Sequence, residues 1–173
     1  LALLRKAPDA PRVLPAWEKR GVDLEPPADD AEARGEVIRF LDATFGIGED
    51  EMGDLMVQDR GRDLWVLSRV AGGREDVDTS RLRAVAAGLR AVRRTKAEPR
   101  ATNALVRCLG ARASRQVLDL TWNEMLELLD SGQREAGVDL DRGQVMLRCE
   151  GRGVACGFVR NGRLELELPK AWR

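Results

Sequence analysis

The amino-acid sequence predicts an α+β fold in two parts, a small α/β domain followed by a partly open β-barrel with one flanking helix. Three patterns predict it: a helical spacing of apolar residues over 31–45, a hairpin pattern over 55–67, and a succession of strand patterns between 145 and 168. Apolar residues make up 43% of the 173-residue chain, which is enough to build a core. Aromatic residues make up only 4%, so we expect Leu, Val and Ala to form most of that core.

We expect residues 1–30 to form an extended arm, because the five prolines in this stretch prevent a long helix. A helix should follow over residues 31–45, where Val37, Leu41 and Phe45 recur on one face. Acidic residues precede its first turn and a glycine follows its last turn, as is usual at the two ends of a helix. This helix would form the α layer of the first domain.

Three further segments predict the sheet of the first domain. Two apolar runs, 55–57 and 64–67, lie on either side of a turn at Gly61 and predict a β-hairpin. Trp65 in the second run is expected to lie in the core. Residues 88–94 alternate apolar and basic side chains, which suits a strand with one charged face.

The middle of the chain predicts three more helices and one strand. Residues 80–87 suit a short helix, and residues 101–109 suit another, which follows a proline and ends before a glycine. A strand is expected over 115–120. A capping-box sequence then opens a helix over 121–129, with Trp122 packed against the sheet.

Strand patterns fill the C-terminal segment. The strands are expected over 145–149, 153–160 and 164–168, and Asn161-Gly162 between the last two is a strong signal for a two-residue hairpin. Gly157 in the middle of a strand indicates either curvature of the barrel or the close approach of a ligand.

The charge of the chain is unevenly distributed, although 29 basic and 29 acidic residues give a net charge of zero. Residues 1–80 carry 11 basic and 18 acidic groups, residues 81–115 carry 10 and 1, and residues 116–173 carry 8 and 10. A basic segment between acidic flanks is typical of a phosphate-binding surface. The alternative is that these arginines form ion pairs with the acidic first half.

Several classes of function are not expected. Histidine is absent, and Cys108, Cys149 and Cys156 have no CxxC spacing, so neither a metal site nor another cofactor is predicted. Cys156 is expected to be a small core residue. No apolar run reaches the roughly 20 residues of a membrane helix. An odd number of cysteines without a secretory signal is typical of a cytoplasmic protein.

The glycine-based motifs of the C-terminal segment resemble a known family. The motifs are Gly143–Arg148, Gly153 with Ala155-Cys156-Gly157, Asn161–Leu164, and Leu168-Pro169-Lys170 with Arg173. In this order they resemble the PUA-like domain appended to RNA cytosine-5 methyltransferases of the Sun/RsmF type. Upstream, residues 45–47, 65–68, 87–90, 100–105 and 113–120 resemble the preceding domain of the same region. The layout is also similar to that of stand-alone ribosome-biogenesis proteins with a pre-PUA domain.

This resemblance spans about residues 31–173, and after the arm over 1–30 it implies a pre-PUA-like α/β domain over 31–114 and a PUA-like RNA-binding domain over 115–173. It implies binding of structured ribosomal or transfer RNA in RNA modification or ribosome biogenesis, with a methyltransferase or a ribosome-assembly protein as a further partner. The chain itself is not expected to be an enzyme. None of its three cysteines has the Pro-Cys setting of that family's nucleophile, and no glycine-rich loop for S-adenosylmethionine follows a strand.

The basic segment and the resemblance together predict the RNA-binding residues, because arginine binds phosphate through two donors and can stack on bases. They are Arg90, Arg93, Arg94, Lys96, Arg100, Arg107, Arg112, Arg115, Lys170 and Arg173. Among the four tryptophans, Trp172 is the best candidate for stacking on a base.

Two other classes of function remain open. The chain could be the C-terminal fragment or a subunit of an S-adenosylmethionine-dependent RNA cytosine-5 methyltransferase. It could also be a protein–protein interaction module that docks through its acidic first half.

Overall fold

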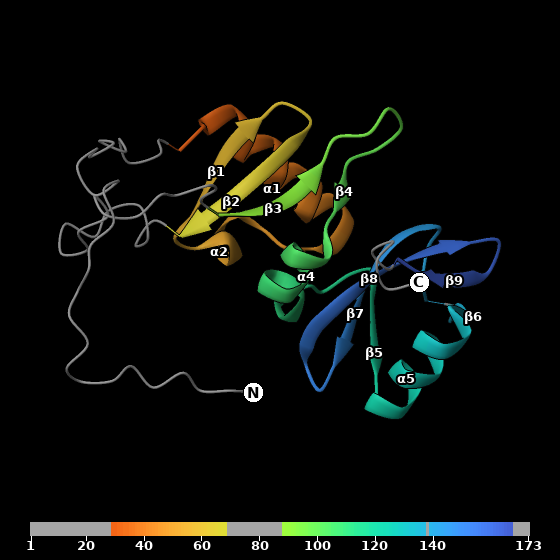
Figure 1. Cartoon of the computed structure of the whole chain (residues 1–173). Coiled ribbons are helices and arrows are strands. Elements are labelled where there is room, and N and C mark those ends of the chain that lie inside the picture. Colours follow the sequence, from red (N-terminus) through yellow and green to blue (C-terminus); the bar gives the residue numbers. More distant parts are fainter. Residues whose placement is uncertain (1–28, 69–87, 138, 168–173) are drawn as a thin grey trace, which may run out of the picture.

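A computed structural model describes residues 29–68, 88–137 and 139–167 (Figure 1). The arm expected over 1–30 falls outside these ranges except for its last two residues, and so does the helix expected over 80–87. Lys170, Trp172 and Arg173 also lie outside the described residues.

The described residues form two β-sheets with a helix between them (Figure 1). The first unit consists of α1 (Ala31–Phe45), α2 (Glu49–Met52), β1 (Leu55–Arg60), β2 (Asp63–Ser68), β3 (Leu89–Arg93) and β4 (Arg100–Ala101). The connecting elements are α4 (Asn103–Leu109) and the short 3-10 helix η2 (Gly110–Arg112). The second unit consists of β5 (Val117–Leu120), α5 (Trp122–Ser131), β6 (Gln133–Glu135), β7 (Gly143–Cys149), β8 (Arg152–Arg160) and β9 (Arg163–Leu166). This is the α+β class that the sequence predicts.

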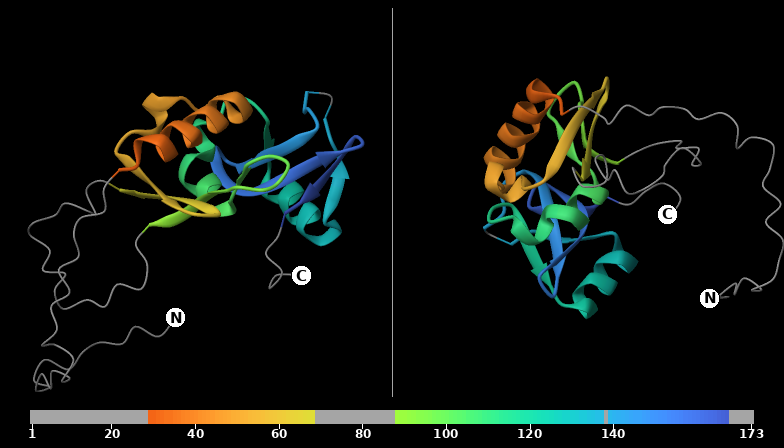
Figure 2. Two further views of the ribbon diagram at one scale, coloured as in Figure 1. Left: turned by 90° about the horizontal axis from the view of Figure 1, so that it is seen from above. Right: turned by 90° about the vertical axis from the view of Figure 1, so that its left-hand side faces the viewer.

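The first sheet is antiparallel in the order β1-β2-β3-β4, and α1 covers one of its faces (Figure 2). Helix α1 has the bounds expected from the sequence. Asp30 caps its N-terminus by accepting a hydrogen bond from the Ala33 N–H, and Gly46 ends it with a φ of 64°. The apolar stripe of Val37, Leu41 and Phe45 is completely buried against the sheet.

Two expectations for the first unit are wrong. Trp65 lies outside the core, because Leu64 and Val66 on either side of it fill the face under α1 and the alternation of a strand turns Trp65 to the opposite face. The helix expected from residue 101 begins at Asn103 instead. Arg100 and Ala101 pair with β3, and Thr102 caps the helix by accepting from the Leu105 N–H.

The second sheet has the order β5-β7-β8-β9-β6 and curls into a half-barrel. The pair β5–β7 is parallel and the other pairs are antiparallel. The three C-terminal strands are confirmed, and so is the hairpin turn, where Asn161 and Gly162 have φ of 52° and 73°. The strand expected over 115–120 begins at Val117, and the sequence did not predict β6.

Helix α5 forms as the capping box predicts and closes at Gly132. The Thr121 hydroxyl accepts from the Glu124 N–H, and the Glu124 carboxylate accepts from the Thr121 N–H. Trp122 does not pack against the sheet as expected, since half of its surface (51%) is exposed.

Helix α4 joins the two units into one packed body (Figure 1). Met146 and Cys156 of the second sheet belong to the same buried cluster as α1, β1–β3 and α4. A separate cluster fills the space between α5 and the second sheet. None of the helices among the described residues is both long and apolar enough to cross a bilayer.

Glycines in β8 allow close packing on both of its sides. Gly153 lies directly against α4, where a Cβ would overlap the Val106 carbonyl oxygen. Gly157 is buried, and a Cβ there would lie 2.6 Å from Cδ1 of Leu164. Protein atoms, and not a ligand, therefore occupy the space beside Gly157.

Candidate RNA interface

The eight described members of the predicted RNA-binding set do not lie on one surface. Arg90 and Arg93 lie on β3, Arg94 follows it, and Lys96 is exposed in the loop between β3 and β4. Arg100 and Arg115 line a cleft between the two units. Arg107 is exposed on α4, and Arg112 on η2 donates to the Glu51 carbonyl.

The face of the first sheet opposite α1 combines a tryptophan with several arginines. Trp65 is half-buried there, and Arg60 lies over its ring with Cζ 4.4 Å from the centroid. Arg90 is the cross-strand partner of Trp65, and Arg93 is the partner of Asp63. The Asp63 carboxylate lies 3.5 Å from Arg90 and 3.2 Å from Arg93. We call Trp65 with Arg60, Arg90 and Arg93 the sheet-face cluster.

A β-bulge puts the two β3 arginines on the same face. Residues three apart in a regular strand point to opposite faces. Here Trp65 pairs with Arg90 and Leu64 pairs with Val92, so Ala91 is the extra residue that the bulge leaves between them. The bulge restores Arg93 to the side of Arg90 while Ala91 and Val92 remain buried.

The chemistry of the sheet-face cluster suits nucleic acid. The ion pairs between Asp63 and the two arginines are exposed, and such pairs contribute little free energy, so a phosphate can compete for the guanidinium groups. A base can stack on the indole of Trp65 when Arg60 moves off the ring, since an exposed cation–π contact contributes only modestly.

Arg94 has different surroundings, because its guanidinium donates hydrogen bonds to three neighbouring segments. It donates to Glu36 on α1 at 2.9 Å, to Asp59 on β1 at 2.7 Å, and to the Gly61 carbonyl at 2.7 Å. Hydrogen bonds from Arg94 lower the pKa of both carboxyl groups. Pairing with acids of the first half is what the alternative reading of the basic segment predicts, and Arg90, Arg93 and Arg115 show it as well, through Asp63 and Asp42.

Substituting Arg94→Gln should lower the free energy of unfolding by about 1–2 kcal/mol at pH 7, since the groups involved are about a third exposed. The difference should shrink as the pH falls below about 4.5. The carboxyls of Glu36 and Asp59 have a lower pKa when folded than unfolded, so their contribution is present above the unfolded-state pKa and is lost as they protonate. Urea denaturation from pH 7 to pH 3, with exposed Arg62→Gln as the control, checks this. A pH-independent difference would contradict it.

The cleft between the two units has a volume of about 1190 Å³. It lies between the end of α1, the loop that joins β3 to β4, the segment 139–144 and the end of β8. Phe158 of β8 lines it half-buried, and the guanidinium groups of Arg100 and Arg160 lie over its ring at 4.9 and 5.4 Å. Arg148 in the same cleft is bound to Asp119 through two hydrogen bonds, so its charge is neutralised locally.

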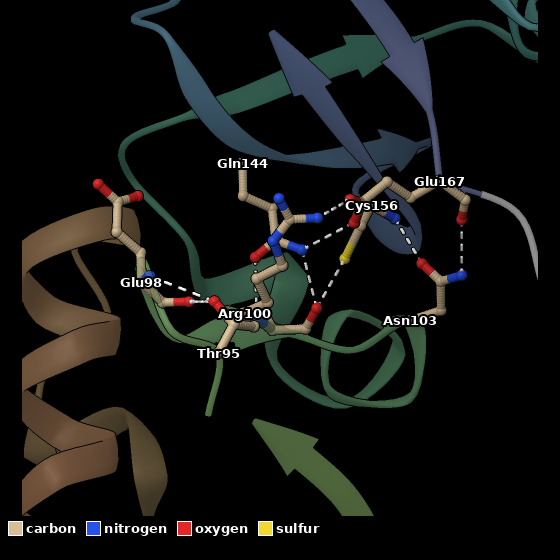
Figure 3. Close-up of polar contacts among 8 residues, drawn as sticks. Thr95, Glu98, Arg100, Asn103, Gln144, Cys156 and Glu167 are labelled. Atoms are coloured by element: carbon tan, nitrogen blue, oxygen red, sulfur yellow. Dashed lines mark hydrogen bonds and ion pairs between the residues drawn. The ribbon is translucent and has the colours of Figure 1, made fainter. Parts of the chain in front are cut away.

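A polar network holds the base of this cleft together (Figure 3). Gln144 of β7 accepts from the Ala101 N–H and donates to the Ala101 carbonyl, both at 2.8 Å. Glu167 accepts from Arg100 at 2.9 Å and from the Gln144 amide at 3.1 Å. Asn103 accepts from the Cys156 N–H at 2.6 Å. The network thereby fixes the positions of β4 and α4 relative to the second sheet.

Two of the described cysteines, Cys149 and Cys156, are buried, and Cys108 is exposed. Cys156 is buried as expected, and burial raises the pKa of its thiol well above its usual range. Burial also raises the pKa of Cys149. No group of three or more possible metal ligands occurs within 29–68, 88–137 and 139–167.

Sequence reasoning missed Trp65 and Phe158 as candidate binding residues. For Trp65, the signal was the apolar residue on each side of it, which leaves the central residue of a strand facing away from the core. For Phe158, the signal was its position two residues before Arg160 in a strand, which puts both side chains on one face.

Comparison with known proteins gives only distant similarity, to solved structures. No protein-family model matches the chain, and no curated protein matches it. Among solved structures, the chain is similar to the crystal structure of hypothetical protein PH0734.1 from the hyperthermophilic archaeon Pyrococcus horikoshii OT3. The two are 14% identical with a TM-score of 0.48, over 83% of this chain and 95% of the other. A similarity this distant gives neither a family nor a function for the chain.

Proposed function

We propose that the protein binds structured RNA through the sheet-face cluster of the first unit, and that it acts in the cytoplasm in RNA modification or ribosome biogenesis. The observation that supports this most is the position of Trp65 between Arg60 and Arg90 on the face of the first sheet opposite α1. The combination provides phosphate donors and a stacking surface in one place. The second unit, with its curled five-stranded sheet, is proposed to be a PUA-like domain. The protein itself is proposed to have no catalytic role.

Removing the charges of Arg90 and Arg93 tests this proposal. The double variant Arg90→Gln/Arg93→Gln should bind ribosomal or transfer RNA at least about tenfold more weakly. The slope of log affinity against log salt should fall by about two, because two phosphate contacts are lost. Filter binding across a salt series measures both quantities.

The matched control removes the same charge elsewhere. Arg39 on α1 and Arg152 on β8 are both exposed and lie outside the sheet-face cluster. The double variant Arg39→Gln/Arg152→Gln should therefore change the slope of log affinity against log salt by less than about 0.5. Equal loss in the two double variants would mean that net charge alone governs binding, and the proposed interface would be rejected. Absent binding by the wild type would reject the function.

Trp65→Leu separates stacking from charge. It should weaken RNA binding by about 1–3 kcal/mol while leaving the salt slope unchanged, because stacking on the indole is lost and no phosphate contact is removed. If Trp65→Leu instead changes the salt slope and leaves the affinity at low salt unchanged, Trp65 positions the neighbouring arginines and does not stack on a base.

A second candidate function, protein binding, is favoured by helix α5. All the large apolar side chains that are exposed among the described residues lie on this helix: Trp122 (51%), Leu126 (59%) and Leu129 (39%). Their spacing of four and three residues puts them on one face. A cluster of exposed apolar residues marks an interaction site.

The charge of α5 indicates what kind of partner would fit. The helix carries three acidic residues and no basic residue, which disfavours RNA and also a second copy of the same face. A basic amphipathic helix of another protein complements both the apolar stripe and the charge. Such a partner could be a methyltransferase domain or a ribosome-assembly protein.

A pair of synthetic helical peptides tests the α5 surface. Both carry the same leucine stripe, one flanked by lysines and the other by glutamates. The lysine peptide should bind at least about tenfold more tightly than the glutamate peptide. Leu126→Asp should abolish this difference in affinity. The control Ser131→Asp adds the same charge at an exposed residue outside the apolar stripe and should preserve the difference. Equal binding of the two peptides would reject this surface as a site for basic helices.

A further inference from the structure

Phe158 occupies the point where the buried core between the two units opens into the cleft. Alternate residues of β8 face this side, and they change from buried Cys156 through half-buried Phe158 to exposed Arg160. An aromatic ring at such a boundary has one part packed on protein and another part accessible from the cleft.

The two guanidinium groups over the Phe158 ring are held differently. Arg100 forms an ion pair with Glu167 at 2.9 Å and is therefore fixed by a group besides the ring. Arg160 is exposed, and within the part of the chain that the structure describes its side chain contacts only this ring. The Arg160 guanidinium can leave the ring at little cost, since an exposed cation–π contact contributes only modestly.

A nucleobase has the chemistry to take the place that Arg160 leaves. Aromatic rings and arginine planes are the surfaces on which unpaired bases stack, and a displaced arginine can pair with the phosphate of the same nucleotide. Glu165 is the cross-strand neighbour of Phe158 on β9 and is exposed. Its negative charge repels a phosphate, which favours binding of the phosphate by Arg160 instead. The cleft, at about 1190 Å³, exceeds the usual size of small-ligand sites and has room for a nucleotide with its adjoining backbone.

We infer that Phe158 and Arg160 form a subsite for one unpaired nucleotide of a bound RNA, with the base stacked on Phe158 and its phosphate bound by Arg160. This rests on the proposed RNA-binding function and adds a second contact, in the cleft between the two units, to the sheet-face cluster. The subsite makes the protein prefer RNA helices that carry a bulged or flipped nucleotide.

Three hairpin RNAs that share one stem sequence test the subsite: one fully paired, one with a single bulged 2-aminopurine, and one with an abasic bulge. The wild-type protein should bind the 2-aminopurine hairpin about tenfold more tightly than the other two, and stacking should quench its fluorescence. Phe158→Leu, which keeps an apolar side chain of similar size, should reduce binding to the level of the paired hairpin. Phe158→Trp should retain the preference, because it keeps a stacking surface. Urea midpoints of the two variants confirm that they fold.

The outcomes separate this inference from the proposed function. If no hairpin binds, the RNA-binding function fails and the subsite with it. If all three hairpins bind equally and Phe158→Leu changes nothing, RNA binding stands and the subsite is overturned. Free adenosine monophosphate is the fourth probe. If it binds within about tenfold of the bulged hairpin in a Phe158-dependent manner, the site serves a mononucleotide and the assignment to RNA is overturned.

Discussion

Replacing Gly153 by alanine is expected to destabilise the protein by about 2–4 kcal/mol. A Cβ at this position would overlap the carbonyl oxygen of Val106 and lie 3.0 Å from Cα of Gly110. Both obstacles are backbone atoms, and they cannot rotate away as a side chain can. Relief requires α4 to move off β8, which disturbs the core that the two units share. Urea denaturation at an unchanged m value measures the loss.

Gly137→Ala is the matched control for this prediction. Nothing lies within 4 Å of a Cβ built at Gly137, and its backbone is outside the positive-φ region. The control should therefore remain within about 0.5 kcal/mol of the wild type. If both variants lose the same free energy, the contact between β8 and α4 is not what requires glycine at position 153.

Local signals in the sequence predicted the elements that local interactions determine. Helix α1 could be placed because its apolar stripe, its Asp30 cap and its Gly46 stop all lie within the helix or next to it. The Asn161-Gly162 turn and the Thr121–Glu124 capping box are equally local. Strands β4 and β6 have two and three residues, too few to show any periodicity, so they form only because neighbouring strands offer partners.

The candidate sites depended on contacts that are distant in the sequence. A run of basic residues predicts that a charged surface exists, but the partners of each arginine decide which residues can bind phosphate. Arg94 is bound to Glu36 and Asp59, which are 58 and 35 residues away. The position of Arg93 beside Arg90 depends on a bulge that exists only in the pairing of β2 with β3. No local pattern contains either fact.

Gln144→Leu is expected to lower the free energy of unfolding by about 2–3 kcal/mol. The Gln144 side chain is only 6% exposed, and its amide binds both the N–H and the carbonyl of Ala101. Leucine has a similar size and preserves the packing, but it leaves the buried Ala101 N–H without this acceptor and the Ala101 carbonyl with only the weak thiol donor of Cys156 at 3.5 Å. Each such group costs about 1–3 kcal/mol, and part of this is recovered when the surrounding structure relaxes.

The same substitution also tests whether the junction of the two units positions the cleft. Gln144 binds β4 to β7 and donates to the Glu167 carboxylate, so its loss removes one of the two side-chain partners of the group that anchors Arg100 beside Phe158. Under conditions where Gln144→Leu remains folded, we expect the preference for a bulged hairpin to fall several-fold while binding of the paired hairpin through the sheet-face cluster is retained. Gln133→Leu on exposed β6 is the control and should change neither stability nor preference. A Gln144→Leu protein as stable as this control would show that its paired amide contributes no net free energy. Loss of paired-hairpin binding in the folded variant would show that the two RNA contacts are not separable.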